Sequence, residues 1–240
     1  ITSMQKILFI DAYNMLYRSR SGWTSGENPI VYTFFRSLRS VLNKFNPDRA
    51  YFVLEGYPKK RMQIDSSYKG QRVREPDEEW SRQKKMCIQI VSENTPVVSV
   101  RHAEREADDV IAHLALVDHA DDECIVVSSD KDFILLAQMR ENLQVYNPIR
   151  KKMQDVPEFD YLKYKSLRGD PSDNIAGFKG IGEKRATAMC IDDEAFDSFM
   201  KVEGRIDAFN KNKEMIMFHE IDSDDSLETL GSSSSPDLLL

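Results

Sequence analysis

Short apolar runs alternate along this chain with segments of helical periodicity, and this order constrains the fold more than any other feature. The clearest helix is predicted from Pro29, with Asn28 as its cap, to Phe45. The apolar runs predict buried strands at residues 6–10, 50–54, 97–100, 124–127 and 143–146. Strands that alternate with helices favour an α/β fold, with a mainly parallel central sheet and helices on both faces.

Acidic residues gather where these strands, and the turns after them, are expected to end. They form four groups: Asp11; Glu106, Asp108 and Asp109; Asp130 and Asp132; Asp170 and Asp173. Ligands of such sheets bind outside the carboxyl ends of the strands. Carboxylates brought together raise one another's pKa unless a hard cation such as Mg²⁺ or Mn²⁺ is bound. The groups therefore predict a metal site.

Local geometry supports this prediction and leaves one alternative open. On a helix that starts near Glu106, this residue and Asp109 share one face, and Asp108 lies to the side. Asp130 and Asp132 are expected in the first turn of the helix after their strand. Each acid alone is equally typical of a helix N-cap. The four groups together favour the metal site.

The chemistry expected at such a site is phosphoryl hydrolysis. Two hard cations can hold the attacking and leaving oxygens of a phosphodiester and lower the pKa of water. The aspartate-rich set disfavours zinc. The four histidines have no HxxxH spacing, so a metalloprotease is not indicated.

Composition limits the class of protein. A chain of 240 residues with 41% hydrophobic content can bury one sizeable core with a small second lobe. No apolar run approaches the roughly 20 residues of a membrane span, and the three cysteines have no CxxC spacing. We expect a protein of a reducing cytoplasm, without a membrane or a disulfide framework.

The net charge of -7 at first argues against a nucleic-acid partner. Residues 220–240 contribute -6 of this total, so residues 1–219 carry only -1. Residues 59–74 contain six basic side chains and a single acid. This basic stretch is either a solvated surface or a binding surface for phosphates.

A glycine-rich segment lies at residues 177–186. It is not a P-loop, because Glu183 follows Gly182 where that motif requires lysine. The segment predicts a short hairpin between two helices that lets the backbone approach a nucleic-acid phosphate, with Lys184 and Arg185 beside it. An ordinary turn is the alternative.

Six segments in this order resemble the motif series of the 5′-nuclease family. This family includes bacteriophage flap endonucleases and the 5′-to-3′ exonuclease domain of bacterial DNA polymerase I. The resemblance extends from about Lys6 to Phe218, and it rests on FIDAYN at 9–14, YKGQR at 68–72, EADD at 106–109, SSDKD at 128–132, GDPSDN at 169–174 and GFKGIG at 177–182.

The resemblance implies a PIN-like core, a helical arch, and a helix-three-turn-helix that binds duplex DNA. It implies a first metal group of Asp11, Glu55, Glu106, Asp108 and Asp109 and a second of Asp130, Asp132, Asp170 and Asp173. Glu55 stands where many relatives have aspartate. The implied contacts to DNA are Lys69 and Arg72 at the scissile phosphate, Gly177, Gly180 and Gly182 with Lys184 and Arg185 at the duplex, and Tyr13 and Tyr68 by stacking or packing.

From this resemblance we expect a 5′-to-3′ exonuclease or flap endonuclease, with Asp11, Lys69, Arg72 and Asp130 as catalytic residues and two Mg²⁺ or Mn²⁺ ions. K⁺ is a candidate at the helix-three-turn-helix. The partners expected are DNA with a 5′ flap or a single-stranded 5′ end, and replication proteins such as a polymerase or clamp, with the chain itself a monomer. An RNA-cleaving PIN-like nuclease and a non-catalytic DNA-binding protein are the alternatives.

The expected domains follow the same resemblance. Residues 1–160 would form the nuclease core, with the arch at about 57–95. Residues 161–219 would form the helical DNA-binding subdomain, and residues 220–240 an acidic, flexible tail.

Overall fold

A computed structural model describes residues 3–22 and 25–231. The chain divides into two compact units, here called the sheet unit, with Ile1–Tyr57, Glu75–Gln154 and Glu220–Leu240, and the helical unit, with Pro58–Arg74 and Asp155–His219. This division differs from the expected one in two ways. Residues 58–74 belong with the helical unit, and the main boundary follows residue 154 instead of 160.

The sheet unit contains a seven-stranded sheet in the order β6-β5-β4-β1-β2-β3-β9. Strands β5, β4, β1, β2 and β3 are parallel, while β6 and β9 pair antiparallel at the two edges. The strands are β1 Lys6–Asp11, β2 Arg49–Val53, β3 Val98–His102, β4 Glu123–Val127, β5 Leu143–Asn147, β6 Lys152–Met153 and β9 Leu227–Leu230. The predicted α/β class and the strands behind it are confirmed.

Strand register brings the carboxyl ends of the central strands to one edge of the sheet. Asp11, the last residue of β1, lies opposite Val53 of β2, and Ile10 lies opposite Val127 of β4. Ser128, which directly follows β4, and Glu55, two residues after β2, therefore lie near the same edge.

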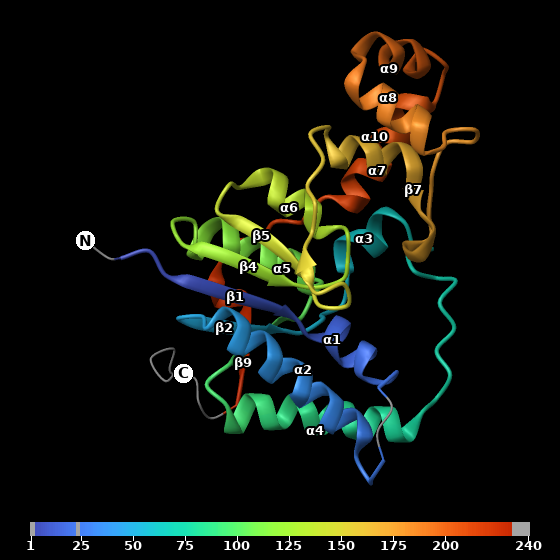
Figure 1. Cartoon of the computed structure of the whole chain (residues 1–240). Helices are drawn as coiled ribbons and strands as arrows, with labels where there is room; N and C mark the ends of the chain where they lie inside the picture. Colours follow the sequence, from blue (N-terminus) through green and yellow to red (C-terminus); the bar gives the residue numbers. More distant parts are fainter. Residues whose placement is uncertain (1–2, 23–24, 232–240) are drawn as a thin grey trace. The chain divides into compact units, whose positions relative to one another are not determined.

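Helices cover both faces of the sheet (Figure 1). One face carries α1 Ala12–Ser19, α2 Pro29–Phe45 and α4 Glu78–Asn94, and the other carries α5 Ala107–His113, its π-helical continuation Leu114–Asp118 and α6 Phe133–Met139. The bounds predicted for α2 are confirmed. Helix α1 was not predicted, because it follows β1 without a turn and spans only 8 residues.

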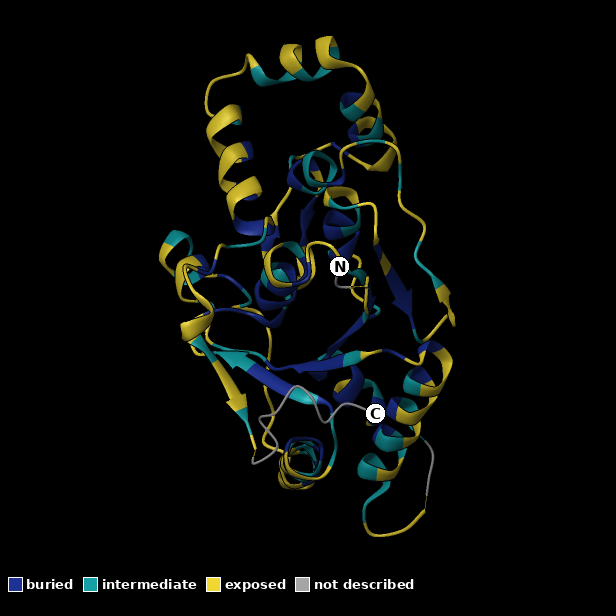
Figure 2. Ribbon diagram, turned by 90° about the vertical axis from the view of Figure 1, so that its left-hand side faces the viewer, coloured by how far each residue is buried: buried dark blue, intermediate teal, exposed yellow. Residues whose placement is uncertain are grey.

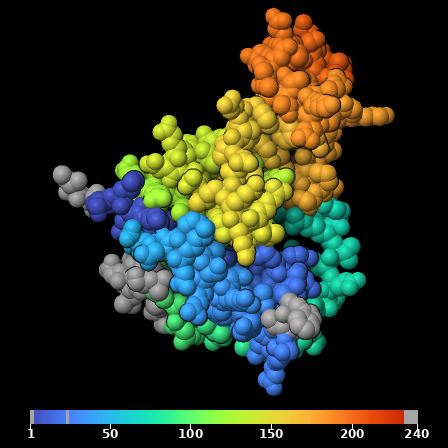
Figure 3. Space-filling view, viewed as in Figure 1, coloured from blue at the N-terminus to red at the C-terminus, as the bar shows by residue number. Residues whose placement is uncertain are grey.

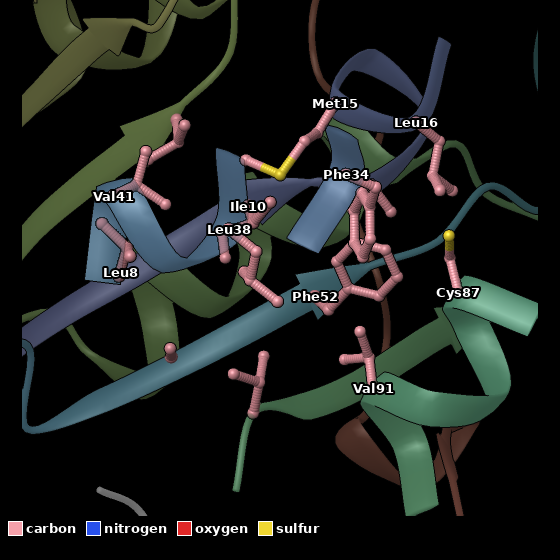
Figure 4. Packing of buried hydrophobic residues seen from close by; sticks show 14 of the residues in the cluster. Leu8, Ile10, Met15, Leu16, Phe34, Leu38, Val41, Phe52, Cys87 and Val91 are labelled. Carbon is pink, nitrogen blue, oxygen red and sulfur yellow. The ribbon is translucent and has the colours of Figure 1, made fainter. Parts of the chain in front are cut away.

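The core lies between the sheet and the α1, α2 and α4 layer (Figure 4). Leu8 and Ile10 of β1 pack there with Phe34 of α2 and Phe52 of β2, whose ring centroids are 5.5 Å apart. Burial of each such side chain stabilises the fold by about 1.5–3 kcal/mol. Figure 2 shows the same division, with the strands of the sheet mainly buried and the helices exposed on their outer sides.

The acidic segment after residue 220 is not a flexible tail within its described part. A 3-10 turn at Asp224–Ser226 leads into β9, which pairs antiparallel with β3 and places Leu227 opposite His102. Arg101 on β3 binds Glu228 at 2.7 Å. The strand was not predicted, because the acids of this segment break the apolar pattern that marks a buried strand. Residues 232–240 of the predicted tail lie outside the described residues.

The helical unit has its own small core. Leu167, Ile181, Ala186, Met189 and Phe209 pack together there. Its elements are α3 Lys59–Ile64, α7 Tyr161–Arg168, β7 Gly169–Asp170, the 3-10 turn Pro171–Asp173, β8 Ile175–Ala176, α8 Glu183–Ile191, α9 Asp193–Met200 and α10 Arg205–Ile216. The helix-three-turn-helix expected within it stays a prediction.

None of the helices within residues 3–22 and 25–231 is both long and apolar enough to cross a membrane.

Candidate metal centre

Asp11 links the ends of two strands of the sheet unit. Its side chain is buried, and Oδ2 accepts a hydrogen bond from Ser128 Oγ at 2.8 Å. The same hydroxyl accepts a hydrogen bond from the backbone N–H of Asp130 at 3.1 Å. Ser128 therefore connects the end of β1 to the loop after β4 and fixes Asp11 relative to Asp130.

Asn14 fixes the same loop from helix α1. Its amide nitrogen donates to Ser129 Oγ at 2.8 Å, and its amide oxygen accepts from the Ser129 N–H at 3.1 Å. No role was predicted for Asn14 or Ser128. Their place inside the FIDAYN and SSDKD motifs was the one available signal.

Glu106, Asp108 and Asp109 form a carboxylate cluster at the start of α5. One carboxylate oxygen from each lies within 4.8 Å of the others, and the side chains of Glu106 and Asp109 are buried. These acids also cap the helix, since Asp109 Oδ2 accepts from the Glu106 N–H at 3.2 Å and Asp108 Oδ1 from the Asp109 N–H at 3.0 Å. Capping and clustering therefore coexist.

Glu55 accepts a hydrogen bond from the N-terminus of α5. Its Oε2 accepts from the Ala107 N–H at 3.1 Å, and its residue is half-buried. The bond holds the end of β2 beside the helix start that carries Glu106, Asp108 and Asp109. Direct metal binding by Glu55 stays a prediction.

Asp130 and Asp132 lie in the loop before α6, not in its first turn as predicted. Helix α6 begins at Phe133, with Asp132 at the N-cap position. Asp130 is exposed, and its Oδ1 accepts from the Asp132 N–H at 2.9 Å. This bond closes the loop, and the helix starts only after Asp132, whereas the pattern placed Asp130 already within its first turn.

Asp170 and Asp173 belong to the helical unit, so the predicted second metal group draws its residues from both units. Asp170 Oδ2 accepts from Lys165 Nζ at 2.8 Å, and Oδ1 from Ser172 Oγ at 2.6 Å. Burial raises the pKa of Asp170, but the hydrogen bonds from Lys165 and Ser172 outweigh it and the pKa lies below its ordinary value. Lys165 was not predicted, because nothing in its local sequence marks it.

Arg72 and Lys69 contact the loop that carries Asp173. Arg72 Nη2 donates to Asp173 Oδ1 at 2.8 Å. The N–H of Lys69 donates to the Asp173 carbonyl at 2.9 Å, and Lys69 has a φ of 55°, which is left-handed. A non-glycine residue there costs on the order of 1–3 kcal/mol.

The basic stretch is only partly a solvated surface. Arg61 is buried, and it donates from Nε to the Met215 carbonyl at 2.9 Å. Tyr68 is only 6% exposed, and Lys69 Nζ lies 5.0 Å from its ring centroid. Burial favours packing as the role of Tyr68 over stacking on a base.

The glycine-rich segment is shaped by two different requirements. A Cβ on Gly177 would lie 2.0 Å from the Arg168 carbonyl oxygen, so only glycine fits against the end of α7. Gly180 has a φ of +80°, and its carbonyl accepts from Arg185 Nη1 at 3.2 Å. Lys184 and Arg185 are exposed at the start of α8, which begins directly after Gly182 and whose orange segment forms part of the surface in Figure 3.

Tyr13 lies on α1 of the sheet unit, two residues after Asp11. It is half-buried, and Lys84 Nζ of α4 lies 5.5 Å from its ring centroid. This contact packs α1 against α4. Stacking of Tyr13 on a base stays a prediction.

The donor chemistry of the cluster on α5 fits a hard divalent cation. Every ligand atom there is a carboxylate oxygen, as Mg²⁺ and Mn²⁺ prefer, and no thiolate joins the described group. Asp11, the last residue of β1, ends at the same edge of the sheet, and its place in a metal group stays a prediction.

Comparisons with known proteins agree with this geometry. The family model described as "5'-3' exonuclease, N-terminal resolvase-like domain" matches residues 6–168. A 5'-3' exonuclease of Aquifex aeolicus is 31% identical over 208 residues, covering 76% of this chain and 68% of the relative. A 5'-3' exonuclease of Mycoplasmopsis pulmonis is 27% identical, covering 76% of this chain and 65% of the relative. The chain spans only 24% of the length of a thermostable DNA polymerase I of Thermus thermophilus, to which it is 31% identical.

Solved structures share the fold. The T5 5'-exonuclease with bound zinc ions matches with a TM-score of 0.67 at 19% identity, covering 88% of this chain and 86% of that one. The catalytic core of Rad2 in complex with DNA substrate matches with a TM-score of 0.53 at 16% identity, covering 92% and 74%. The sheet unit thus has the PIN-like 5′-nuclease fold, and the motifs, the sheet and the matched residues together show that the chain belongs to the 5'-3' exonuclease family.

Proposed function

We propose that this chain is a divalent-metal-dependent, structure-specific 5′ nuclease. It hydrolyses DNA phosphodiesters at 5′ flaps or single-stranded 5′ ends and leaves a 5′-phosphate and a 3′-hydroxyl. The observation that carries the proposal is the carboxylate cluster of Glu106, Asp108 and Asp109, whose oxygens lie within 4.8 Å of one another in a member of this family. The Rad2 core is one solved relative in complex with DNA substrate.

The acidic residues would form two groups, each of which would bind one cation. Asp11, Glu55, Glu106, Asp108 and Asp109 would form the first metal group, and Asp130, Asp132, Asp170 and Asp173 the second. Two bound Mg²⁺ or Mn²⁺ ions would lower the pKa of water and offset the charge that develops on the phosphodiester. Ser128 and Asn14 keep Asp11 and the Asp130 loop in fixed relation.

The basic residues would orient the substrate. Lys69 and Arg72 would contact the scissile phosphate, where fixed cations stabilise developing negative charge. The N-terminus of α8 would bind the backbone of duplex DNA through N–H groups after Gly182 and through the exposed charges of Lys184 and Arg185. A K⁺ ion at the carbonyls of this turn belongs to the same proposal.

A single labelled 5′-flap DNA tests the proposal. Cleavage is expected with Mg²⁺ or Mn²⁺ and not with EDTA. Asp130→Asn and Asp170→Asn should abolish cleavage while DNA binding, measured by fluorescence anisotropy, stays within a few-fold of wild type. Asp225→Asn changes an exposed acid in the 3-10 turn before β9 and should cut at the wild-type rate. Wild-type cleavage by the Asp130 and Asp170 variants would refute the metal assignment.

The same assay separates the alternative functions. An RNA-cleaving nuclease would cut a matched RNA flap and leave the DNA flap intact. A non-catalytic binding protein would bind the flap without a metal-dependent product. Cleavage of the DNA flap alone supports the proposal.

A further inference from the structure

Lys69 has a backbone conformation that a lysine rarely adopts. Its φ of 55° places it in the left-handed region, where the Cβ of any residue except glycine crowds the following carbonyl. Such a conformation persists only when neighbouring contacts hold it. The contacts that hold Lys69 therefore identify residues that determine where its side chain starts.

Asn174 supplies one of these contacts. Its Nδ2 donates to the Ser67 carbonyl at 2.8 Å, and the same carbonyl accepts from the Gly70 N–H at 2.8 Å. Lys69 lies between Ser67 and Gly70 in the sequence, and its N–H donates to the Asp173 carbonyl at 2.9 Å. The turn around Lys69 is thus closed from both sides by the end of the Asp170–Asn174 loop.

Gln71 supplies a second contact to the same loop. Its Nε2 donates to the Pro171 carbonyl at 2.8 Å and to the Ser172 carbonyl at 3.0 Å. Arg72 Nε also donates to the Ser172 carbonyl at 3.0 Å. Both segments belong to the helical unit, where the chain after α3 runs beside the β7 loop (Figure 1).

We propose that Asn174 and Gln71 are positioning residues, which hold Lys69 in its left-handed conformation against the Asp170–Asn174 loop so that its ammonium group acts on the scissile phosphate. The inference rests on the proposed nuclease function and deepens it. Among the described residues, the two amide nitrogens donate to backbone carbonyls, so we expect their effect on the reaction to pass through Lys69.

A purely structural role has a matched control in the same segment. Lys211 of α10 binds Asp65 at 2.8 Å and so tethers residues 58–74 at another point. Lys211→Met should remove this tether and leave the hydrogen bonds of Asn174 and Gln71 in place. If the amides only fasten the segment, Lys211→Met should reproduce their effect on the reaction.

Single-turnover cleavage of the labelled flap DNA tests the positioning role. Asn174→Gly removes the amide while glycine accepts the φ of 59° at this position. It should lower the cleavage rate about tenfold, in line with the cost of small misplacements, with the Kd for DNA within about twofold. Gln71→Ala, at an exposed residue, should lower the rate about threefold by the same reasoning. Lys211→Met should cut at the wild-type rate.

A double-mutant cycle shows whether Asn174 acts through Lys69. Lys69→Ala should lower the rate about 100-fold, and adding Asn174→Gly should change it less than about twofold further. A further tenfold loss, or wild-type rates in both Asn174→Gly and Gln71→Ala, would overturn the proposal. Thermal melting verifies that each variant is folded. Failure of the proposed function itself is distinguishable, because wild type would then not cut the flap.

Discussion

The acids of the two units are held in different ways. In the sheet unit, Glu106, Asp108 and Asp109 gather against one another and accept hydrogen bonds from backbone N–H groups. In the helical unit, Asp170 and Asp173 also have carboxylate oxygens within 4.8 Å of each other, but Asp170 faces Lys165 and Asp173 faces Arg72, each at 2.8 Å. The first arrangement concentrates negative charge, whereas the second neutralises it with side chains of the same unit. A divalent cation should therefore matter more to the sheet unit.

Among the variants that follow, the largest effect should come from removing a charge from the cluster on α5. Asp108→Asn should lower the rate of flap cleavage by about 10²–10³-fold, the size of effect found when one charge-stabilising group is lost. The measurement is single-turnover cleavage in Mg²⁺, with Asp225→Asn as the matched neutralisation. A loss below about threefold would show that the cluster on α5 is a helix cap only.

Metal binding should stabilise the sheet unit more than the helical unit. Mg²⁺ at about 100 times its Kd should raise the free energy of unfolding by about 2.7 kcal/mol, seen as a higher Tm. Glu106→Gln should remove most of this increase in Tm. Asp173→Asn should remove less, because Arg72 already neutralises the charge of Asp173. Equal losses in both variants would erase the distinction between the two arrangements.

Lys165→Met should isolate the contribution of the cation beside Asp170. The pKa of this carboxyl lies below its ordinary value, so the pair stabilises the fold above the unfolded pKa, and this stabilisation is lost as pH falls through the folded pKa. We expect a loss of about 1 kcal/mol at pH 7, reduced by solvent screening. Urea denaturation at pH 7 measures it, and the difference should shrink at pH 3. A difference that stays constant with pH would indicate lost packing instead.

The smallest effect concerns Asp118, which ends the π-helical continuation of α5, and Asp224, in the 3-10 turn before β9. Partial desolvation of its carboxyl and the neighbouring Asp224 raise the pKa of Asp118 to about 6. A raised pKa stabilises the protonated fold, and this stabilisation is lost as pH rises through about 6.

Asp118→Asn cannot ionise, so its Tm should exceed that of wild type by about 1–2 °C at pH 8, a small gain because both acids are exposed. Thermal melting between pH 4 and pH 8 should show the gain developing up to about pH 6. A lower Tm at pH 8 would show that the hydrogen bond outweighs the repulsion.

Much of the sheet unit could be predicted from the sequence, because its signals are local. Apolar runs mark β1, β2 and β4, and the acids at or shortly after their ends, Asp11, Glu55 and Asp130, mark the edge where the strands end. The cluster of Glu106, Asp108 and Asp109 follows from spacing on one helix. Asp130 and Asp132 were placed one turn too far along, since a loop closed by its own hydrogen bonds has no periodicity.

The helical unit depends on contacts that no local pattern contains. Residues 58–74 join it through Arg61 at the end of α10, about 150 positions away in the chain, and through Gln71 at the loop after Asp170. Asp170 and Lys165 are five positions apart, but the partnership requires the change of direction at Gly169, whose φ of +69° ends α7 directly before Asp170. Strand β9 was missed for a related reason, because its pairing with β3 reaches across more than 120 residues.

Strand β9 also determines how the sheet meets other molecules. Without it, β3 would end the sheet and present the free N–H and C=O groups of Val98–His102, which can template the addition of a strand from another chain. With it, the outermost strand is four residues long and carries the charge of Glu228, both features that oppose such addition. The acidic segment therefore opposes self-assembly through the edge of the sheet. This contribution to colloidal stability is separate from the contribution of β9 to the fold.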